Sequence, residues 1–230
     1  MHRYFLGLKE LDDAIGGIDG GTNIMLIGPP MCGKGALLNS IITAGLRSGE
    51  AVILVETRLP GRDALQKLKP PVGAQVGVVD CVTRALGVNA PDTAGVRHIS
   101  SPVDLTGVGV RVSQLTDEFG RADADGLRLG IDSLSTMLMY SSLQTVYRFM
   151  HVIAGRVAMQ HNLGVYVVDE DMHDAQTIAT LKQLFNAVLE VRNDQDRTFV
   201  RAVGLTARPT PWFEYEVRDH TASIRGAADD

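Results

Sequence analysis

The segment from residue 28 to residue 35 has the residue types and spacing of a phosphate-binding loop. It reads Gly-Pro-Pro-Met-Cys-Gly-Lys-Gly and so contains the pattern G-x-x-x-x-G-K. Glycines let the backbone curl until successive N–H groups point at phosphate oxygens, and Lys34 supplies a full charge for the terminal phosphates. We expect the phosphates of ATP or ADP to contact Gly28, Pro29, Pro30, Met31, Cys32, Gly33, Lys34, Gly35 and Ala36.

The residue after the lysine departs from this motif. The motif has Ser or Thr there, because the hydroxyl coordinates Mg²⁺, whereas this chain has Gly35. A water can take the empty coordination place, since Mg²⁺ readily keeps waters. Catalysis depends on accurate placement of the metal. We therefore expect weakened nucleotide binding, a weakly held Mg²⁺ ion and a larger loss of hydrolysis.

The pattern of apolar residues indicates the elements that position this loop. Short apolar runs alternate with amphipathic stretches, which is typical of β-α-β units and a mostly parallel sheet. A buried strand over residues 23–27 precedes the loop, and a helix with an apolar stripe follows it over about 34–47. A chance lysine in a glycine-rich turn is the alternative to a phosphate site, and it does not explain why strand, glycines, lysine and helix fall in register. Further strands are expected over residues 51–55, 75–79, 127–131 and 164–168.

The alternation of strand-like and helix-like segments ends at about Asn186. Strand-like runs over 187–191, 198–203 and 212–217 follow each other with short gaps, which favours an antiparallel end to the sheet. We expect residues 225–230 to form a frayed tail. The length fits a single α/β domain over residues 1–230.

Three further segments resemble the KaiC-like branch of the RecA superfamily. Residues 6–17 look like its G-x-x-x-L-D-x-x-x-G-G lead-in, residues 50–56 are similar to its G-E-x-x-x-x-x-x-E stretch, and residues 131–135 look like its hydrophobic-Asp-Ser-Leu Walker B segment. The resemblance spans roughly residues 6–217. It implies a RecA-like P-loop NTPase fold, with a twisted, mainly parallel sheet between helices. It also implies a homo-oligomer, a ring or a filament, that binds ATP between subunits.

The resemblance implies roles for three more residues. Asp132 would be the Walker B carboxylate that orients Mg²⁺ through water, and Glu56 would activate the attacking water. Each follows the end of an expected strand, where ligands bind in open α/β sheets, although a solvated acid or a helix cap would look the same. Arg208 remains from the family's K-x-R segment, as an interface arginine finger or as an ordinary surface arginine.

The catalytic set is incomplete in this chain. Gly35 lacks the hydroxyl, Thr57 stands where many relatives have a second acid, and Thr206 replaces the lysine of K-x-R. These departures favour a slow or inactive ATPase. A dense acidic segment over residues 169–174 could bind a metal or line the nucleotide pocket. We favour a solvated loop that leads into a helix N-terminus, because the spacing of a transition-metal site is absent.

Composition sets the broad class of the protein. Of its 230 residues, 45% are hydrophobic and 21% are charged, which is ordinary for a packed domain. The net charge of −5 gives no basic footprint of a dedicated nucleic-acid binder. Two cysteines without a pairing motif indicate a reducing compartment, and no apolar run reaches the length of a membrane span. We therefore expect a cytoplasmic protein that binds no membrane.

Three functions remain open from the sequence. The first is a KaiC-like ATP-binding module with weak or absent hydrolysis, whose nucleotide state controls assembly or an unidentified protein partner. The second is a non-catalytic oligomeric scaffold that retains the RecA fold. The third is an accessory ATPase of DNA recombination or repair, which the acidic charge balance counts against.

Overall fold

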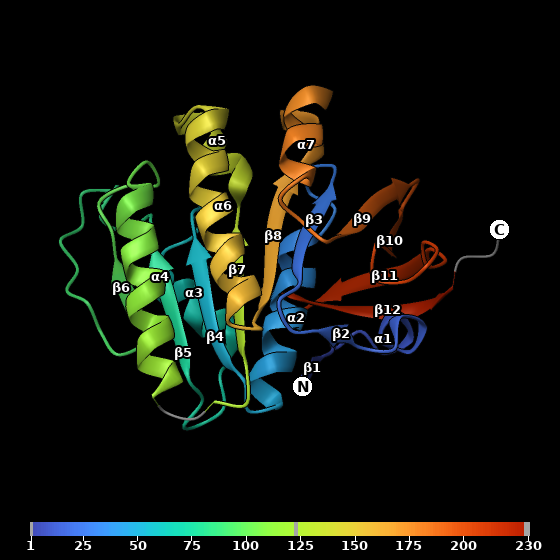
Figure 1. Ribbon diagram of the computed structural model, residues 1–230, viewed down its shortest axis with the longest axis horizontal. Coiled ribbons are helices and arrows are strands. Elements are labelled where there is room, and N and C mark those ends of the chain that lie inside the picture. Colours follow the sequence, from blue (N-terminus) through green and yellow to red (C-terminus); the bar gives the residue numbers. More distant parts are fainter. Residues whose placement is uncertain (1, 122–123, 228–230) are drawn as a thin grey trace.

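The computed structural model describes residues 2–121 and 124–227 (Figure 1). Within them, ten strands form one sheet in the order β12-β11-β10-β9-β3-β8-β7-β4-β5-β6. The strands from β9 to β6 in this order are parallel, and β9 to β12 are antiparallel. The strands of this sheet are β3 (Asn23–Gly28), β4 (Ala51–Glu56), β5 (Val76–Asp80), β6 (Val96–His98), β7 (Leu127–Asp132), β8 (Leu163–Asp169), β9 (Ala187–Asp194), β10 (Arg197–Val203), β11 (Phe213–Arg218) and β12 (Thr221–Ala227).

Helices cover both faces of the sheet (Figure 1). Side chains of α1, α2 and α3 belong to one buried cluster, and side chains of α4, α5, α6 and α7 belong to the other. A short ribbon of β1 (Arg3–Tyr4) and β2 (Ile18–Asp19) stands apart from the main sheet. The helices are α1 (Lys9–Ile15), α2 (Lys34–Arg47), α3 (Gly61–Leu68), α4 (Leu105–Gly120), α5 (Leu134–Tyr140), α6 (Leu143–Met159) and α7 (Ala175–Lys182), with a 3₁₀ turn η1 (Glu170–Met172) before α7.

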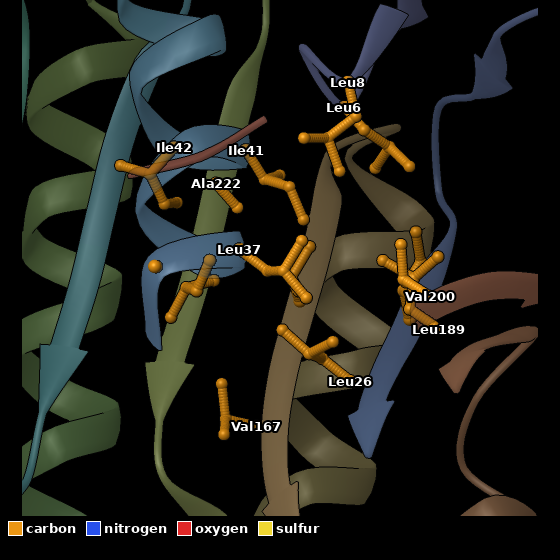
Figure 2. Close-up of a cluster of buried hydrophobic side chains, with 14 of the residues drawn as sticks. Leu6, Leu8, Leu26, Leu37, Ile41, Ile42, Val167, Leu189, Val200 and Ala222 are labelled. Atoms are coloured by element: carbon orange, nitrogen blue, oxygen red, sulfur yellow. The ribbon is translucent and has the colours of Figure 1, made fainter. Parts of the chain in front are cut away.

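The two clusters follow from strand alternation. In β3, Leu26 lies in the cluster with α2, and Met25 lies in the cluster with α6, because successive side chains of a strand point to opposite faces. Figure 2 shows Leu26 next to Leu37 of α2, with Ile41 of the same cluster further along that helix. The sheet is therefore buried on both faces in its parallel part, as the apolar runs predict.

The architecture confirms the expected α/β fold, a mainly parallel sheet between helices with an antiparallel C-terminal end. Two strands of the main sheet, β6 and β12, are not predicted from the sequence, and neither are the two-residue strands β1 and β2. β6 has only three residues, too few to show a period, and β12 is rich in small and polar residues. The prediction of a frayed tail is wrong for residues 225–227, because they belong to β12. Residues 228–230 lie outside the described part of the chain.

The register of the parallel strands brings the candidate residues together at one edge. Gly28 is the partner of Asp169 between β3 and β8, and Glu56 is the partner of Asp132 between β4 and β7. The arrowheads of β3, β4 and β8 point the same way in Figure 1. The phosphate loop, Glu56, Asp132 and the start of the acidic segment thus meet at the carboxyl edge of the sheet.

Candidate functional site

The phosphate loop joins β3 directly to α2. Gly33 is the N-cap of α2 and has a φ of 86°, a left-handed conformation that glycine adopts without strain. A Cβ atom there would also lie 2.8 Å from Cγ2 of Val217 in β11. The hydroxyl of Tyr215 donates a hydrogen bond to the carbonyl of Cys32. The antiparallel strands therefore press against the loop and fix its course.

The inner N–H groups of this loop are not used by the fold. Within residues 2–121 and 124–227, none of the main-chain N–H groups from Met31 to Gly35 donates a hydrogen bond. The N–H groups of Ala36 and Leu37 are the first in the segment with an acceptor, the carbonyl of Gly33, at 2.9 and 3.1 Å. Free N–H groups at the start of a helix are an anion-binding arrangement.

Lys34 lies beneath this loop and is almost fully buried, with 4% of its surface exposed. Its Nζ atom is 2.8 Å from the carbonyl oxygen of Gly28, contacts that of Pro29, and is 2.9 Å from Oδ1 of Asp169. These three oxygen contacts match the three donors of an ammonium group, and Sγ of Cys32 lies 3.5 Å from the same nitrogen. A phosphate would have to replace at least one of them to bind Lys34 directly.

Asp169 is a site residue that the sequence reading places wrongly. We interpret residues 169–174 as a solvated loop, but Asp169 is only 9% exposed and pairs with Lys34. The remainder of that interpretation is confirmed, because Glu170 and Asp171 are exposed and Asp174 caps α7 by accepting from the N–H of Thr177.

Asp132 pairs with an arginine that the sequence reading does not single out. Arg58 Nη2 is 2.5 Å from Asp132 Oδ2. Asp132 is 7% exposed, and its other carboxylate oxygen, Oδ1, is buried without a hydrogen-bond partner among the described residues. Burial raises the pKa of Asp132, while the Arg58 charge opposes that shift. The sequence does contain a signal for this contact. Arg58 is a cation two positions after the end of β4, and β4 pairs with β7, the strand that ends at Asp132.

Glu56 is held by the turn that follows its own strand. Its Oε1 atom accepts hydrogen bonds from the N–H groups of Arg58 and Leu59, at 2.9 and 3.1 Å. Burial, assisted by the charge of Asp132, raises the pKa of Glu56 to about 7. A carboxylate with such a pKa can act as a general base near neutral pH, but one of its oxygens already serves the turn.

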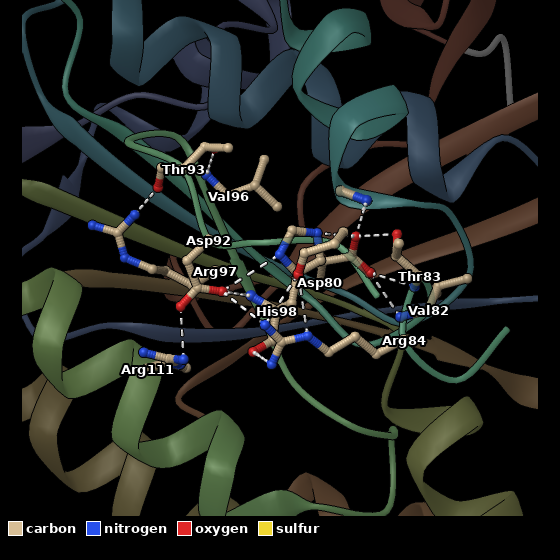
Figure 3. A network of polar contacts seen from close by, with 12 residues as sticks. Asp80, Val82, Thr83, Arg84, Asp92, Thr93, Val96, Arg97, His98 and Arg111 are labelled. Carbon is tan, nitrogen blue, oxygen red and sulfur yellow. Dashed lines mark hydrogen bonds and ion pairs between the residues drawn. The ribbon is translucent and has the colours of Figure 1, made fainter. Parts of the chain in front are cut away.

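The turn between β4 and α3 is anchored at both ends. At the start, the N–H and the hydroxyl of Thr57 donate to the carbonyl of Asp132, at 2.8 and 2.9 Å. At the end, the N–H of Gly61 donates to Oδ2 of Asp80, at 2.7 Å. Burial alone would raise the pKa of Asp80, but hydrogen bonds from Thr83 and the main chain outweigh it and lower that pKa. Figure 3 shows Asp80 within this polar network.

Two depressions flank the phosphate loop. One has a volume of about 190 Å³ and is lined by Gly35, Glu56, Arg58, Lys67, Asp132 and His220, among others. The second, on the side of β11 and β12, has a volume of about 560 Å³ and includes Met31, Gly33, Arg197, Tyr215 and Arg225 in its lining. Sites for small molecules usually measure roughly 300–1,000 Å³. The first depression therefore has room for phosphate groups but not for a complete nucleotide.

Arg208 lies apart from both depressions. It is exposed, in the loop between β10 and β11, where its carbonyl accepts from the hydroxyl of Thr206. It is not brought together with Lys34, Glu56 or Asp132 within this chain. Its role as an arginine finger therefore stays a prediction about an assembly.

The strand order, together with the phosphate loop at the carboxyl edge of the sheet, defines the class of this protein. It is an α/β protein with a RecA-like fold of the KaiC type. A family model matches residues 21–191, from β3 through most of β9. The chain belongs to that family, which is described as a family of unknown function (DUF7504). No curated protein matches the sequence.

Two solved structures from Pyrococcus horikoshii resemble the chain along nearly its whole length. One is an uncharacterized protein, PH0321, in complex with an unknown peptide, with a TM-score of 0.73 and 15% identity over 98% of this chain and 100% of that one. The other is the KaiC-like protein PH0186, with a TM-score of 0.70 and 13% identity over 97% and 98% of the two chains. At such identities the likeness concerns the fold. Within the described residues no helix has the length and apolar character that a membrane span requires.

Proposed function

We propose that this chain is a nucleotide-binding module that takes the phosphates of ATP or ADP on the loop from Gly28 to Ala36 and hydrolyses ATP slowly or not at all. The observation that carries the proposal is the set of unused N–H groups from Met31 to Gly35 at the N-terminus of α2, with Lys34 beneath them. Main-chain donors and a helix dipole stabilise an anion without any further side chain.

Weak hydrolysis follows from how the catalytic candidates are already engaged. Glu56 has one oxygen on the main chain of its turn, and Asp132 is paired with Arg58. Positioning and electrostatic stabilisation account for most of the catalysis of phosphoryl transfer. Because Glu56 and Asp132 already bind other groups, they supply little positioning or electrostatic stabilisation to the reaction. The regulatory effect would therefore come from which nucleotide is bound rather than from ATP turnover.

Lys34 limits the affinity. Its ammonium has to give up at least one of its contacts, to the carboxylate of Asp169 or to the carbonyls of Gly28 and Pro29, when it binds a phosphate oxygen. The net gain is therefore the difference between two charged interactions, which is smaller than either one. We expect affinity in the micromolar to millimolar range, weaker than if Asp169 were neutral.

A homo-oligomer completes this proposal. The smaller depression is too small for a whole nucleotide, so base and ribose would lie on the open side of the loop. A neighbouring subunit can cover them there, with Arg208 as a candidate contact. If the homo-oligomer forms only when nucleotide is bound, nucleotide binding would regulate assembly. The assembled form would then act on a further protein partner.

The test is calorimetric titration with ATP and ADP of wild type, Lys34→Ala and Lys9→Ala. Lys9 is an exposed lysine on α1 and serves as the matched loss of one charge. We expect the Lys34→Ala affinity to fall at least about tenfold, because a hydrogen-bonded charge is lost, and Lys9→Ala to bind like wild type. Absence of binding at millimolar ATP would leave the oligomeric scaffold. Binding of DNA that weakens steeply with salt would instead favour the accessory role in DNA repair.

A further inference from the structure

We propose that the guanidinium of Arg58 takes the place of Mg²⁺, so that this site binds nucleotide phosphates without a metal ion. The inference rests on the proposed nucleotide site and adds to it the identity of the cation. Its basis is the arrangement of Gly35, Arg58 and Asp132 at the start of α2.

The residues present do not fit a magnesium ion. Mg²⁺ requires near-octahedral oxygen ligands at about 2.0–2.1 Å, and Gly35 offers no side-chain oxygen. The carboxylate oxygen of Asp132 that faces this place is bound to Arg58 Nη2 at 2.5 Å. A dication beside a guanidinium is also repelled by it.

The position of Gly35 explains how the guanidinium of Arg58 fits beside Asp132. A Cβ atom on residue 35 would lie 3.3 Å from Arg58 Nη2 and 3.5 Å from Asp132 Oδ2. The hydroxyl of a Ser or Thr would extend further into the same space. Glycine therefore leaves the guanidinium in its place, whereas a side chain on residue 35 would require the guanidinium to shift by a few tenths of an ångström.

Arg58 keeps enough hydrogen-bonding capacity to bind a ligand. Guanidinium carries five N–H donors in a planar fork that matches phosphate geometry. Within residues 2–121 and 124–227, Asp132 is the only acceptor that its side chain contacts. The side chain is 41% exposed and lines the depression of about 190 Å³ together with Gly35 and Lys67. Its free donors can therefore reach phosphate oxygens in that depression.

The backbone of Arg58 is fixed before any ligand arrives. Its own N–H donates to Glu56 Oε1, and the turn is tied to Asp132 through Thr57 and to Asp80 through Gly61. A preorganised group loses less conformational entropy on binding. Glu56 and Thr57 thus act as positioning residues for Arg58. This gives a use to Thr57, a position that departs from the pattern of an active ATPase.

The experiment is calorimetric titration of the full chain with ADP in EDTA and in excess Mg²⁺. We expect wild-type affinity to agree within about threefold in the two conditions. In EDTA, Arg58→Ala should bind at least about tenfold more weakly, since hydrogen bonds to a charged group are lost. Arg62→Ala, which removes an exposed arginine four residues further along, should match wild type. Thermal unfolding of each variant separates a folding defect from a binding defect, and Arg58→Lys keeps the charge that pairs with Asp132.

The reverse change tests whether the arginine and the metal are interchangeable. The double variant Gly35→Thr/Arg58→Ala restores the hydroxyl and empties the space, so we expect ADP binding that depends on the metal. Electron paramagnetic resonance of Mn²⁺ should then show one bound ion per bound ADP in the double variant and none in wild type. Wild-type binding that requires Mg²⁺, or an unchanged affinity of Arg58→Ala in EDTA, would overturn the inference and leave the nucleotide site intact. Absence of wild-type binding in both conditions would instead overturn the nucleotide site itself, and the inference with it.

Discussion

Burial of Glu56 makes the stability of the fold depend on pH. Its pKa is raised from an ordinary value of 4.5 to about 7, so between these values the folded state binds a proton that the unfolded state has released. Stability therefore falls as pH rises from about 4.5 to 7. A shift of this size corresponds to roughly 3 kcal/mol, present as a cost above pH 7 and absent at acidic pH.

Glu56→Gln removes this cost and keeps the local structure. The amide oxygen of Gln can still accept from the N–H groups of Arg58 and Leu59. We expect the difference in unfolding free energy between variant and wild type to be larger at pH 8 than at pH 5, by up to roughly 3 kcal/mol, in favour of the variant. Titrating groups that do not interact with Glu56 are common to both proteins and cancel in this double difference. Asp132 is the exception, because its charge interacts with that of Glu56.

Urea unfolding at pH 5 and pH 8, followed by far-UV circular dichroism, measures these values. Equal m-values for the two proteins would show that the same surface unfolds. A difference between variant and wild type that is the same at both pH values would refute the reasoning, because Glu56 would then carry the same charge in folded and unfolded chains.

Two other predictions concern residues away from Glu56. Arg128 and Glu50 form a buried pair with 1% and 2% of their side chains exposed. Arg128→Met leaves the buried Glu50 carboxylate with His2 as its remaining side-chain partner and should lower the unfolding free energy by about 3–5 kcal/mol. Arg128→Met/Glu50→Gln should recover part of that loss in the same urea titration, and a double variant no better than the single one would contradict the pairing. Arg208 is exposed and outside the candidate site of its own chain, so Arg208→Ala should leave monomer stability unchanged and weaken ATP-dependent assembly in light scattering, whereas unchanged assembly would make it an ordinary surface arginine.

The sequence predicts the helices and strands around the site well, because the residue patterns that indicate them lie within short segments of the chain. The helix over residues 34–47 and the strand before it are confirmed, since their apolar periods are complete within a few turns. The phosphate loop also lies where G-x-x-x-x-G-K requires. The parallel order of the strands follows from alternation of strands and helices, and it brings Glu56 and Asp132 to one edge.

The contents of the site depend on tertiary contacts that the sequence pattern does not contain. Lys34 meets Asp169 because β3 and β8 pair in a particular register, and 135 positions separate the two residues in the chain. The gap left by Gly35 is visible in the sequence, but Arg58 reaches it only through the course of the turn after β4. The roles of Glu56, Asp132 and Arg208 in catalysis stay predictions.

The most direct test of the account is to observe the amides of the phosphate loop while ADP is added. In ¹H–¹⁵N correlation spectra of the labelled protein, we predict that the resonances of residues 31–35 shift progressively with ADP and that these shifts are absent in Lys34→Ala. Spectra in which those amides stay unchanged at saturating ADP, or in which the shifts fall only elsewhere on the fold, would contradict it.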